Sequence, residues 1–368
     1  MPPAVLESPR GNRGERRHVK KKTLRRKGDA VTIHEVAYKA GVSPMTVSRV
    51  INGNVNVREA TRERVMHAVR DLNYTPNPAA RSLAAAQGAR IALIYSNPSS
   101  AYLSELLVGA LAGVSRTAAQ LVLDTWDYNS AAAQRAAARK LATAVAGVIL
   151  PCPFCESKAV VSELTAANIP VVAVASARFQ SEISSVRIDD FRASKEMTEY
   201  LIKKGHTRIG YIKGNPNQTA SARRFEGFQA ALHDAGIAVD ETLVEQGLFT
   251  YRSGLESTRK LLAHKRAPTA IFASNDDMAA AAISVAHRRG LDVPRDLSVV
   301  GFDDTPIATT VWPELTTIHQ PIADMAESSI DLLLRSIRRK NGETRVVVDQ
   351  VVPHILVKRD SVAAPPAK

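Results

Sequence analysis

The chain has 368 residues, of which 45% are hydrophobic and 23% are charged, and this is the composition of a soluble protein with two or three domains. No stretch approaches the roughly 20 consecutive apolar residues of a membrane span, which excludes a transmembrane protein. The basic N-terminal residues precede no apolar segment, so we expect no secretory signal and a cytoplasmic location.

The positive charge is concentrated near the N-terminus. Residues 1–90 contain 18 Lys and Arg against 7 Asp and Glu, which accounts for +11 of the net charge of +13. Residues 1–30 are rich in Arg, Lys, Pro and Gly, and we expect them to be disordered. A basic end on a nearly neutral body favours a polyanionic partner, either nucleic acid or an anionic membrane surface. The alternative for residues 1–30 is an arm that only aids solubility.

The next segment shows helical periodicity in short pieces. Thr32 and Glu35 have the spacing of a capping box, which predicts a helix that begins near Thr32. Gly41 can adopt the left-handed conformation that turns the chain. Ser43 is a favourable N-cap and Pro44 a favourable first helical residue. The pattern therefore predicts a helix-turn-helix motif.

The outward face of the second predicted helix is polar and carries no acidic residue. Arg49 can read a guanine edge with two hydrogen bonds, and Ser and Thr hydroxyls can bind bases or phosphates. The helix N-terminus at Ser43 also attracts a phosphate. This face favours DNA binding, although the spacing alone would fit a helical domain that binds no nucleic acid. The outward set comprises Pro44, Met45, Thr46, Ser48, Arg49 and Asn52.

Apolar, β-rich runs alternate with helical stretches from Ala89 onward, after a linker (Tyr74–Gly88) that contains a short Ala-rich helix. Such a helix is not stable alone in water. The alternation predicts parallel sheets with helices on both faces, and because the second half repeats the first in type, we expect two doubly wound lobes. Ligands of such sheets bind beyond the carboxyl ends of the strands, which predicts a cleft between the lobes.

The only cysteines, Cys152 and Cys155, form a C-x-x-C pair. Such a pair can be a redox dithiol or half of a zinc site. No second pair is present in the sequence, and Pro151 and Pro153 indicate a loop rather than the helix start that is typical of redox pairs. We therefore expect two loop thiols in a reducing compartment, with no metal site and no cofactor.

From Val31 to about Arg359 the chain resembles the lactose-repressor/galactose-repressor family of transcriptional regulators. The resemblance rests on "VTIHEVAYKAGVSPMTVSRVINGN", "GHTRIGYIKG", "RRFEGFQAAL", "TAIFASNDDMA", "VPRDLSVVGFDD" and "LTTIHQP". It implies an all-α helix-turn-helix headpiece, a hinge helix and an α/β core whose two lobes resemble periplasmic binding proteins. It also implies a homodimer on a near-palindromic DNA operator, controlled by a small effector such as a mono- or disaccharide.

The resemblance divides the chain into five segments and assigns residues to DNA contact. Met45 falls at a sequence-reading position and can offer only apolar contact, for example to a thymine methyl group. Leu83 matches the residue that wedges between base pairs in the minor groove. Arg58 departs from the family's usual Ser cap, which weakens the start of that helix by about 1 kcal/mol. The segments are a basic arm (1–30), the headpiece (31–76), the hinge helix or linker (77–88), the two-lobed core (89–360) and a disordered tail (361–368). The residues expected to contact DNA are Thr32, Ser43, Pro44, Met45, Thr46, Ser48, Arg49, Asn52, Asn56 and Leu83.

No catalytic motif is present in the sequence, neither G-x-S-x-G nor a P-loop nor a G-x-G-x-x-G that opens a helix. The acids in "SNDD" and "FDD" follow buried-type strands, where hydrogen bonding to a polar ligand is a better interpretation than hydrolysis. The family's effector contacts are matched by Tyr102, Arg224, Phe249, Asn275, Asp303 and Gln320, a set that suits a polyol. The alternatives are core packing for Phe249 and an ion pair that bridges the lobes for Arg224 and Asp303.

One departure lies in the cleft: the family often has an Asp after "IPVVAV", where this chain has Ala175 followed by Ser176. No particular sugar can therefore be carried over. A solute-binding protein of a sugar transport system is the alternative function, but it predicts an export signal and no headpiece. An enzyme on a doubly wound fold is disfavoured by the missing motifs. We expect the effector to release the protein from DNA. Because the C-terminus has no leucine heptads, we expect a dimer without a tetramerising coiled coil.

Overall fold

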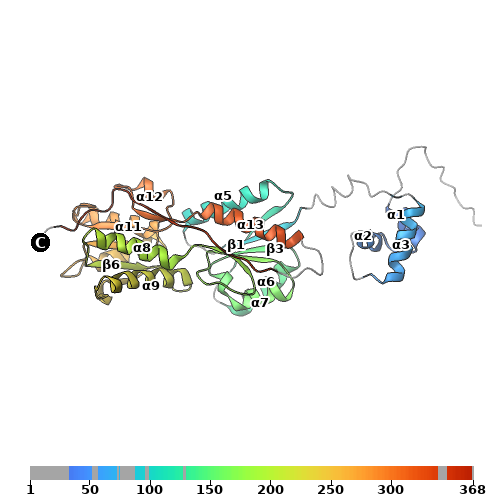
Figure 1. Cartoon of the computed structure of the whole chain (residues 1–368), viewed down its shortest axis with the longest axis horizontal. Coiled ribbons are helices and arrows are strands. Elements are labelled where there is room, and N and C mark those ends of the chain that lie inside the picture. The colour runs from blue at the N-terminus through green and yellow to red at the C-terminus, as the bar shows by residue number, and fades with distance from the viewer. Residues whose placement is uncertain are drawn as a thin grey trace, which may run out of the picture. The chain divides into compact units, whose positions relative to one another are not determined.

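The computed structural model describes residues 33–51, 57–72, 74, 88–95, 99–126, 130–338 and 346–366. They belong to two compact units, Met1–Ala84 and Ala85–Lys368 (Figure 1). Among the expected DNA contacts, Thr32, Asn52, Asn56, Leu83 and the side chain of Ser48 lie outside the described part. The same holds for the expected basic arm and for most of the expected hinge.

The first unit contains α1 (Ile33–Ala40), α2 (Pro44–Ile51) and α3 (Glu59–Asp71). Their apolar faces meet around Val36, Val47 and Val65, each fully buried. Apolar residues spaced three or four positions apart lie on one side of a helix, and the apolar sides of the three helices pack against one another in a small core. The three helices expected of a headpiece are therefore present.

The turn between α1 and α2 has the predicted geometry. Gly41 has φ +64°, its N–H donates to the Tyr38 carbonyl and the Val42 N–H donates to the Ala37 carbonyl, the two bonds of a Schellman motif. The Ser43 hydroxyl then accepts from the Thr46 N–H at 3.2 Å, so Ser43 caps α2 as expected. The helix-turn-helix prediction is confirmed.

The first lobe of the second unit contains a parallel sheet with the strand order β11-β5-β4-β3-β1-β2. Helices α5 and α13 pack together on one face, and α6 and α7 pack together on the other (Figure 1). The elements are β1 (Arg90–Tyr95), α5 (Ser100–Ser115), β2 (Gln120–Thr125), α6 (Ala131–Ala142), β3 (Gly147–Pro151), η1 (Phe154–Glu156), α7 (Lys158–Ala166), β4 (Val171–Val174), β5 (Ser184–Arg187), α13 (Ile322–Arg338) and β11 (Asp349–Val351). Strands β3 and β4 are buried along their whole length, as strands covered on both faces must be.

The second lobe repeats this architecture with the order β7-β6-β8-β9, also parallel. Helices α8 and α9 pack together, and so do α10 and α11. The elements are α8 (Asp190–Lys203), β6 (Ile209–Lys213), α9 (Thr219–Asp234), η2 (Glu241–Leu243), β7 (Val244–Gln246), α10 (Tyr251–Leu261), β8 (Ala270–Ala273), α11 (Asp276–Arg288), β9 (Ser298–Val300), α12 (Ile307–Thr310), β10 (Thr317–His319) and β12 (Ile355–Val357). The prediction of two doubly wound lobes is confirmed.

The chain passes between the lobes at three places within the described residues: between β5 and α8, between β10 and α13, and between β11 and β12. Strands β10 and β12 pair antiparallel beside the second lobe, so the C-terminal part of the chain ties the lobes together, as expected. In each sheet the order reverses beside the first strand, between β1 and β3 and between β6 and β8. Ligands bind at such switch points, beyond the carboxyl ends of the strands.

The expectation of a disordered tail that starts at residue 361 is wrong for residues 361–366. Ser361 is fully buried, and its hydroxyl donates to the Val299 carbonyl at 2.6 Å and accepts from the Thr316 N–H at 2.9 Å. The Ala363 carbonyl lies 2.9 Å from Nε2 of His206. The tail is short and rich in Ala and Pro, but its serine and backbone satisfy groups of β9 and its neighbours, so it is held on the second lobe.

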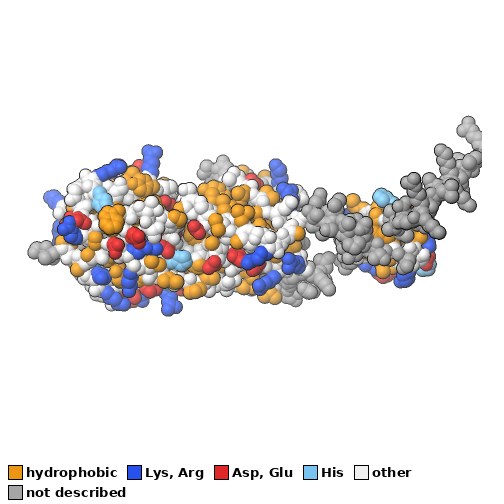
Figure 2. All heavy atoms as spheres, turned by 90° about the horizontal axis from the view of Figure 1, so that it is seen from above, with side chains coloured by type: hydrophobic (Ala, Val, Ile, Leu, Met, Phe, Trp, Pro, Cys, Tyr) orange, Lys and Arg blue, Asp and Glu red, His pale blue; other side chains and the backbone are white. Residues whose placement is uncertain are grey.

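The surface of the first lobe carries an apolar patch. Val108 and Leu111 on α5 and Leu123 on β2 are each more than half exposed. Figure 2 shows hydrophobic side chains gathered over the region of α5. Among the described residues, no helix is both long and apolar enough to cross a membrane.

Candidate functional site

The outward face of α2 carries the predicted reading residues that the structure describes. Val47 and Val50 are buried on the opposite face, whereas Ile51 is only half-buried. Met45 is 64% exposed, Arg49 is exposed, and Pro44 and Thr46 are half-exposed. Because the inward valines fix the rotation of α2, the structure brings Ser43, Met45 and Thr46 together at its N-terminal end.

The N-terminus of α2 is already partly organised. The Thr46 hydroxyl lies 2.9 Å from the Ser43 hydroxyl, and the Thr46 N–H donates to that same oxygen. The first turn of α2 contains no acidic residue, so the positive end of the helix dipole is not neutralised from within the helix. This end can therefore receive a phosphate oxygen.

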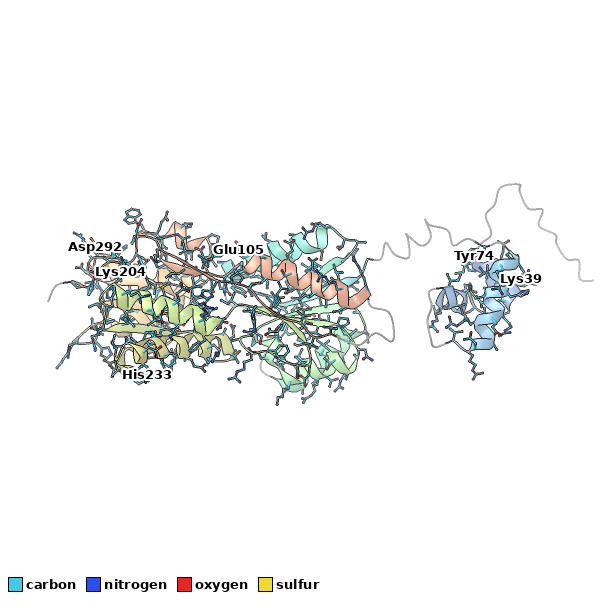
Figure 3. All side chains as sticks on the ribbon, in the orientation of Figure 1. Lys39, Tyr74, Glu105, Lys204, His233 and Asp292 are labelled. Atoms are coloured by element: carbon cyan, nitrogen blue, oxygen red, sulfur yellow. The ribbon has the colours of Figure 1, made fainter. Side chains whose placement is uncertain are left out.

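Helix α3 packs behind α1 and α2 and supports this face. An ion pair of 2.8 Å joins Lys39 of α1 to Asp71 at the end of α3, and Figure 3 labels Lys39 and Tyr74 on this unit. The Tyr74 N–H donates to the Val69 carbonyl. Arg58 precedes α3 and provides no side-chain cap, so the missing cap inferred from the sequence is confirmed.

A cleft between the two lobes lies beyond the carboxyl ends of both sheets. Its empty space is about 430 Å³, open solvent included, and the part that can hold the centre of a water molecule is about 30 Å³. Such a space accommodates about one water, so this arrangement of the lobes is a closed one. The lining residues are Ser99, Tyr102, Pro151, Cys152 and Ala175 from the first lobe and Gln218, Ala220, Arg224, Phe249, Asn275 and Asp303 from the second.

Arg224 of α9 lies at the centre of the polar wall and is almost fully buried. Its Nε donates to Asp190 Oδ1 at 2.8 Å, and its Nη1 donates to the Ser274 carbonyl at 2.6 Å and lies 3.4 Å from Asp303 Oδ1. The guanidinium also lies 3.6 Å from the centre of the Phe302 ring. The expected alternative, an ion pair that bridges the lobes, is wrong because Arg224, Asp190 and Asp303 all belong to the second lobe.

Asp303 follows β9 and is held in an unusual backbone conformation, with φ +109°. Its Oδ1 accepts from Gln320 Nε2 at 2.6 Å. Burial raises the pKa of Asp303 to about 7, although Arg224 and Gln320 oppose the rise. Asp303 is therefore an acceptor whose ionisation changes near neutral pH. Gln320 does not line the cavity and acts on it only through Asp303.

Phe249 and Asn275 form the adjoining wall. Phe249 is 6% exposed and has φ +60°, and a Cβ added at Gly214 would lie 2.0 Å from its ring. Asn275 Nδ2 donates to the Phe249 carbonyl at 3.1 Å, while its Oδ1 accepts from the Met278 N–H and caps α11. Positive φ also occurs at Ala175 and Asp304, so strained backbone gathers at this cleft, as it does at functional sites.

The wall from the first lobe is less polar. The Tyr102 N–H donates to the Ser99 hydroxyl, which caps α5, and burial raises the pKa of the Tyr102 hydroxyl well above its ordinary value. Tyr102 is therefore a neutral hydrogen-bonding group. Pro151, Cys152 and Ala175 complete this wall with no charge, and Ala175 occupies the position where a ligand-facing Asp was the family expectation.

Five of the six predicted effector residues line the cavity, but the sequence reasoning missed Asp190 and Glu156. Asp190 follows β5 in "RIDDF", the same strand-end acid pair that singled out "SNDD" and "FDD", so a signal was available. Glu156 of η1 accepts from the Thr219 N–H at 3.1 Å and also from the Thr219 hydroxyl. Because Thr219 opens α9 in the other lobe, Glu156 joins the two lobes, and no local pattern predicts that contact.

Comparisons with known proteins match both the N-terminal helical unit and the two-lobed unit. The family of "Bacterial regulatory proteins, lacI family" matches residues 32–77, and a "Periplasmic binding protein-like domain" matches residues 198–362. The chain is 34% identical to catabolite control protein A of Priestia megaterium over 90% of this chain and 99% of that protein.

Two solved structures are similar over almost their whole length. The transcriptional regulator CelR in complex with cellobiose has a TM-score of 0.68 and 33% identity, covering 90% of this chain and 99% of that one. The lac repressor dimer bound to operator and the anti-inducer ONPF has a TM-score of 0.68 and 30% identity, covering 91% and 100%. The chain belongs to the lacI family of bacterial regulatory proteins and is a DNA-binding transcriptional regulator, not an enzyme.

Proposed function

We propose that this regulator is a repressor whose affinity for a near-palindromic operator is set by a sugar bound between the two lobes. The observation that carries the proposal is the pairing of a polar wall, with Arg224, Asn275 and Asp303, and an uncharged wall around Tyr102. Carboxylate, amide and guanidinium groups bind neighbouring hydroxyls, and the Phe249 ring can cover the apolar face of a pyranose.

The groups of the polar wall are held in position by other groups of the protein. Asp190 and the Ser274 carbonyl hold the guanidinium of Arg224, and Gln320 holds the carboxylate of Asp303. A ligand that meets fixed polar groups loses less free energy to ordering them. Gln320 thus supports the site from behind the wall, and the other five expected residues contact the effector.

Entry of a sugar requires the lobes to separate, because the closed cleft has room for about one water. The three crossings between the lobes are the natural hinge for that motion. A ligand held by both walls favours closure by its differential affinity for the two arrangements, which is typically about 1–3 kcal/mol. That shift changes the operator affinity of the dimer, and release from DNA is the direction we favour.

The DNA-reading surface is α2. Its exposed Met45 and Arg49 face away from the buried valines, and its capped N-terminus suits a phosphate. Pro44, Thr46 and the Ser43 hydroxyl complete the described part of this surface. The family pattern adds Thr32, Ser48, Asn52, Asn56 and the wedge Leu83, together with a basic arm (1–30), a headpiece (31–76) and a hinge (77–88).

The functional unit is a homodimer that acts in the cytoplasm, where the operator DNA lies. The exposed apolar patch of Val108, Leu111 and Leu123 supports pairing of two copies, because contiguous apolar surface of this kind marks interaction sites. The lac repressor structure that the chain resembles is also a dimer. The solute-binding alternative is not favoured, because a helix-turn-helix precedes the lobes and the relatives are regulators.

The test is selection of binding sites from a pool of random duplexes by the full-length protein, followed by titration of the selected site with mono- and disaccharides. We expect a near-palindromic site and at least one sugar that changes its affinity. Arg224→Ala should abolish the response to that sugar while operator binding without sugar persists. Failure to enrich any site would end the proposal of operator recognition, and a site that no sugar affects would end the proposal of sugar control.

A further inference from the structure

The two expected loop thiols lie in the turn after β3 and in the short 3-10 helix η1. Cys152 follows β3, Cys155 lies in η1, and both are buried. Their sulfur atoms are 3.2 Å apart, and Cys152 Sγ lies 3.3 Å from Oε1 of Glu156. The two sulfurs and a carboxylate oxygen all lie within 4.8 Å of one another. The sequence contains no second cysteine pair, but the carboxylate of Glu156 provides a third possible ligand beside the two sulfurs.

We propose that Cys152, Cys155 and Glu156 bind one thiophilic divalent cation, with Zn²⁺ as the reference ion. Two sulfur ligands select soft and borderline ions over Mg²⁺ or Ca²⁺. Three protein ligands and an open fourth position are the donor set of zinc sites that keep a water or a bound molecule as the fourth ligand. Cys152 lines the effector cleft, so the ion and its fourth ligand reach the site from the cleft.

The geometry requires only a small adjustment. Two Zn–S bonds of about 2.3 Å at a tetrahedral angle place the sulfurs about 3.8 Å apart. The observed separation of 3.2 Å must therefore grow by about 0.6 Å, which small rotations of the two side chains can supply. Cys152 Sγ lies within hydrogen-bonding distance of Oε1 of Glu156, of the Ala175 carbonyl and of Cys155 Sγ. Binding of the cation displaces the thiol protons to solvent, and the ion then lies between the two sulfurs and the carboxylate.

The carboxylate is already held in position by groups that are not ligands. Glu156 Oε2 accepts from the Thr219 N–H at the start of α9, and Oε1 accepts from the hydroxyls of Thr219 and Ser176. Oε1 can ligate the ion while Oε2 keeps its bond to α9. Groups that orient a ligand in this way are typical of metal sites.

The competing interpretation is that the thiols only fill the core. Both sulfurs belong to an apolar cluster that includes Phe154 and Val160. In that case the pair would bind no metal ion, and replacing either cysteine would change only the stability of the lobe. Metal binding by the intact, reduced protein separates the two interpretations without any variant.

The experiment adds Co²⁺ to the full-length protein under reducing conditions and records the thiolate-to-cobalt charge-transfer absorption in the near ultraviolet. The chain has only two cysteines, so such a band reports this pair and no other. We expect the band to appear and Zn²⁺ to abolish it by displacing the cobalt. Absence of the band at a stoichiometric excess of Co²⁺ would overturn the proposal.

Variants then test each ligand by competition with a chromophoric zinc chelator. Cys152→Ser and Cys155→Ser should each weaken zinc binding by about 100-fold or more, beyond the roughly 10- to 100-fold loss that removal of an orienting partner causes. Glu156→Gln should weaken it by at least about tenfold, and the matched control Ser176→Ala should weaken it less than Glu156→Gln. Equal affinity of Glu156→Gln and the parent protein would refute the three-ligand site. Neither experiment uses DNA or sugar, so their failure leaves the proposed function untouched.

Discussion

Replacing Asp303 by Asn tests whether the polar wall of the cleft holds an acid that titrates near neutral pH. The Asp303 side chain is almost fully buried, and its burial raises its pKa from 3.8 to about 7 against the influence of Arg224 and Gln320. Asn has nearly the same shape and still offers an oxygen to Gln320. The substitution therefore removes the ionisation and changes the packing little.

The direction of the pH effect on the free energy of unfolding follows from the number of protons that the native and unfolded states bind. Between pH 4 and 7 the native protein holds a proton on Asp303 that the unfolded chain has released, because the folded pKa is the higher one. The stabilisation from that proton is complete below the unfolded pKa and is lost as the pH rises through about 7. At about 1.4 kcal/mol per unit, the loss between pH 5 and 7 is about 3 kcal/mol.

The assay is urea unfolding of the ligand-free full-length protein at pH 5 and pH 7.5, followed by tryptophan fluorescence. Both tryptophans, Trp126 and Trp312, lie in the second unit, so the signal reports the two lobes. Relative to the parent, Asp303→Asn should gain about 3 kcal/mol between the two pH values, since titrating groups that lie far from Asp303 cancel in the comparison.

The matched control is Asp349→Asn. Hydrogen bonds from Arg187 lower the pKa of Asp349, so this group is ionised in the folded and unfolded states throughout the window. Its replacement should leave the pH dependence unchanged, whatever it does to stability itself. If Asp303→Asn and the parent protein showed the same pH dependence, the assignment of a buried, protonatable acid to this wall would be wrong.

Three further substitutions test the other structural arguments. Arg49→Ala should weaken operator binding by about 1–3 kcal/mol, measured by fluorescence anisotropy, and leave sugar binding unchanged; equal loss of both would indicate misfolding. Arg58→Ser should supply the missing cap of α3 and raise the stability of the headpiece by about 1 kcal/mol. Thermal unfolding followed by circular dichroism measures this gain, and no gain would show that the helix start is capped in another way. Ser361→Ala should lower the free energy of unfolding of the second lobe by about 1–3 kcal/mol, because the Val299 carbonyl and the Thr316 N–H lose their hydrogen-bond partner. An unchanged midpoint of urea unfolding would contradict a structural role for the tail.

The parts of the fold that were predictable are those set by neighbours in the sequence. The turn at Gly41 and the cap at Ser43 depend on residues at most five positions apart, so their signals survive in a single sequence. The alternation of strands and helices is equally local. Strand β5 was missed because Ser184–Arg187 is short and three of its four residues are polar, although it pairs with β4 and β11.

The cleft was predictable where residues follow strands and unpredictable where the lobes meet. Arg224 and Asp303 were expected at the cleft, but their partner Asp190 lies 34 positions from Arg224, and only the folded lobe shows that it bonds the guanidinium. Ser361 shows the opposite error: disorder was expected for an end rich in Ala and Pro, while two backbone groups of the second lobe required a partner. Composition describes the chain on average and cannot identify such a single buried serine.

The contact between Glu156 and Thr219 bears directly on how such a cleft can act as a switch. The two residues belong to different lobes, so the bonds from the Thr219 N–H and hydroxyl to the carboxylate exist only while the cleft is closed. A hydrogen bond to a charged group contributes about 1.5–3 kcal/mol, and a typical effector shifts an equilibrium by about 1–3 kcal/mol. Because the two contributions are similar, this contact and a modest effector influence the balance between the arrangements by comparable amounts. The sensitivity of the regulator is therefore set as much by this contact between lobes as by the groups that touch the ligand.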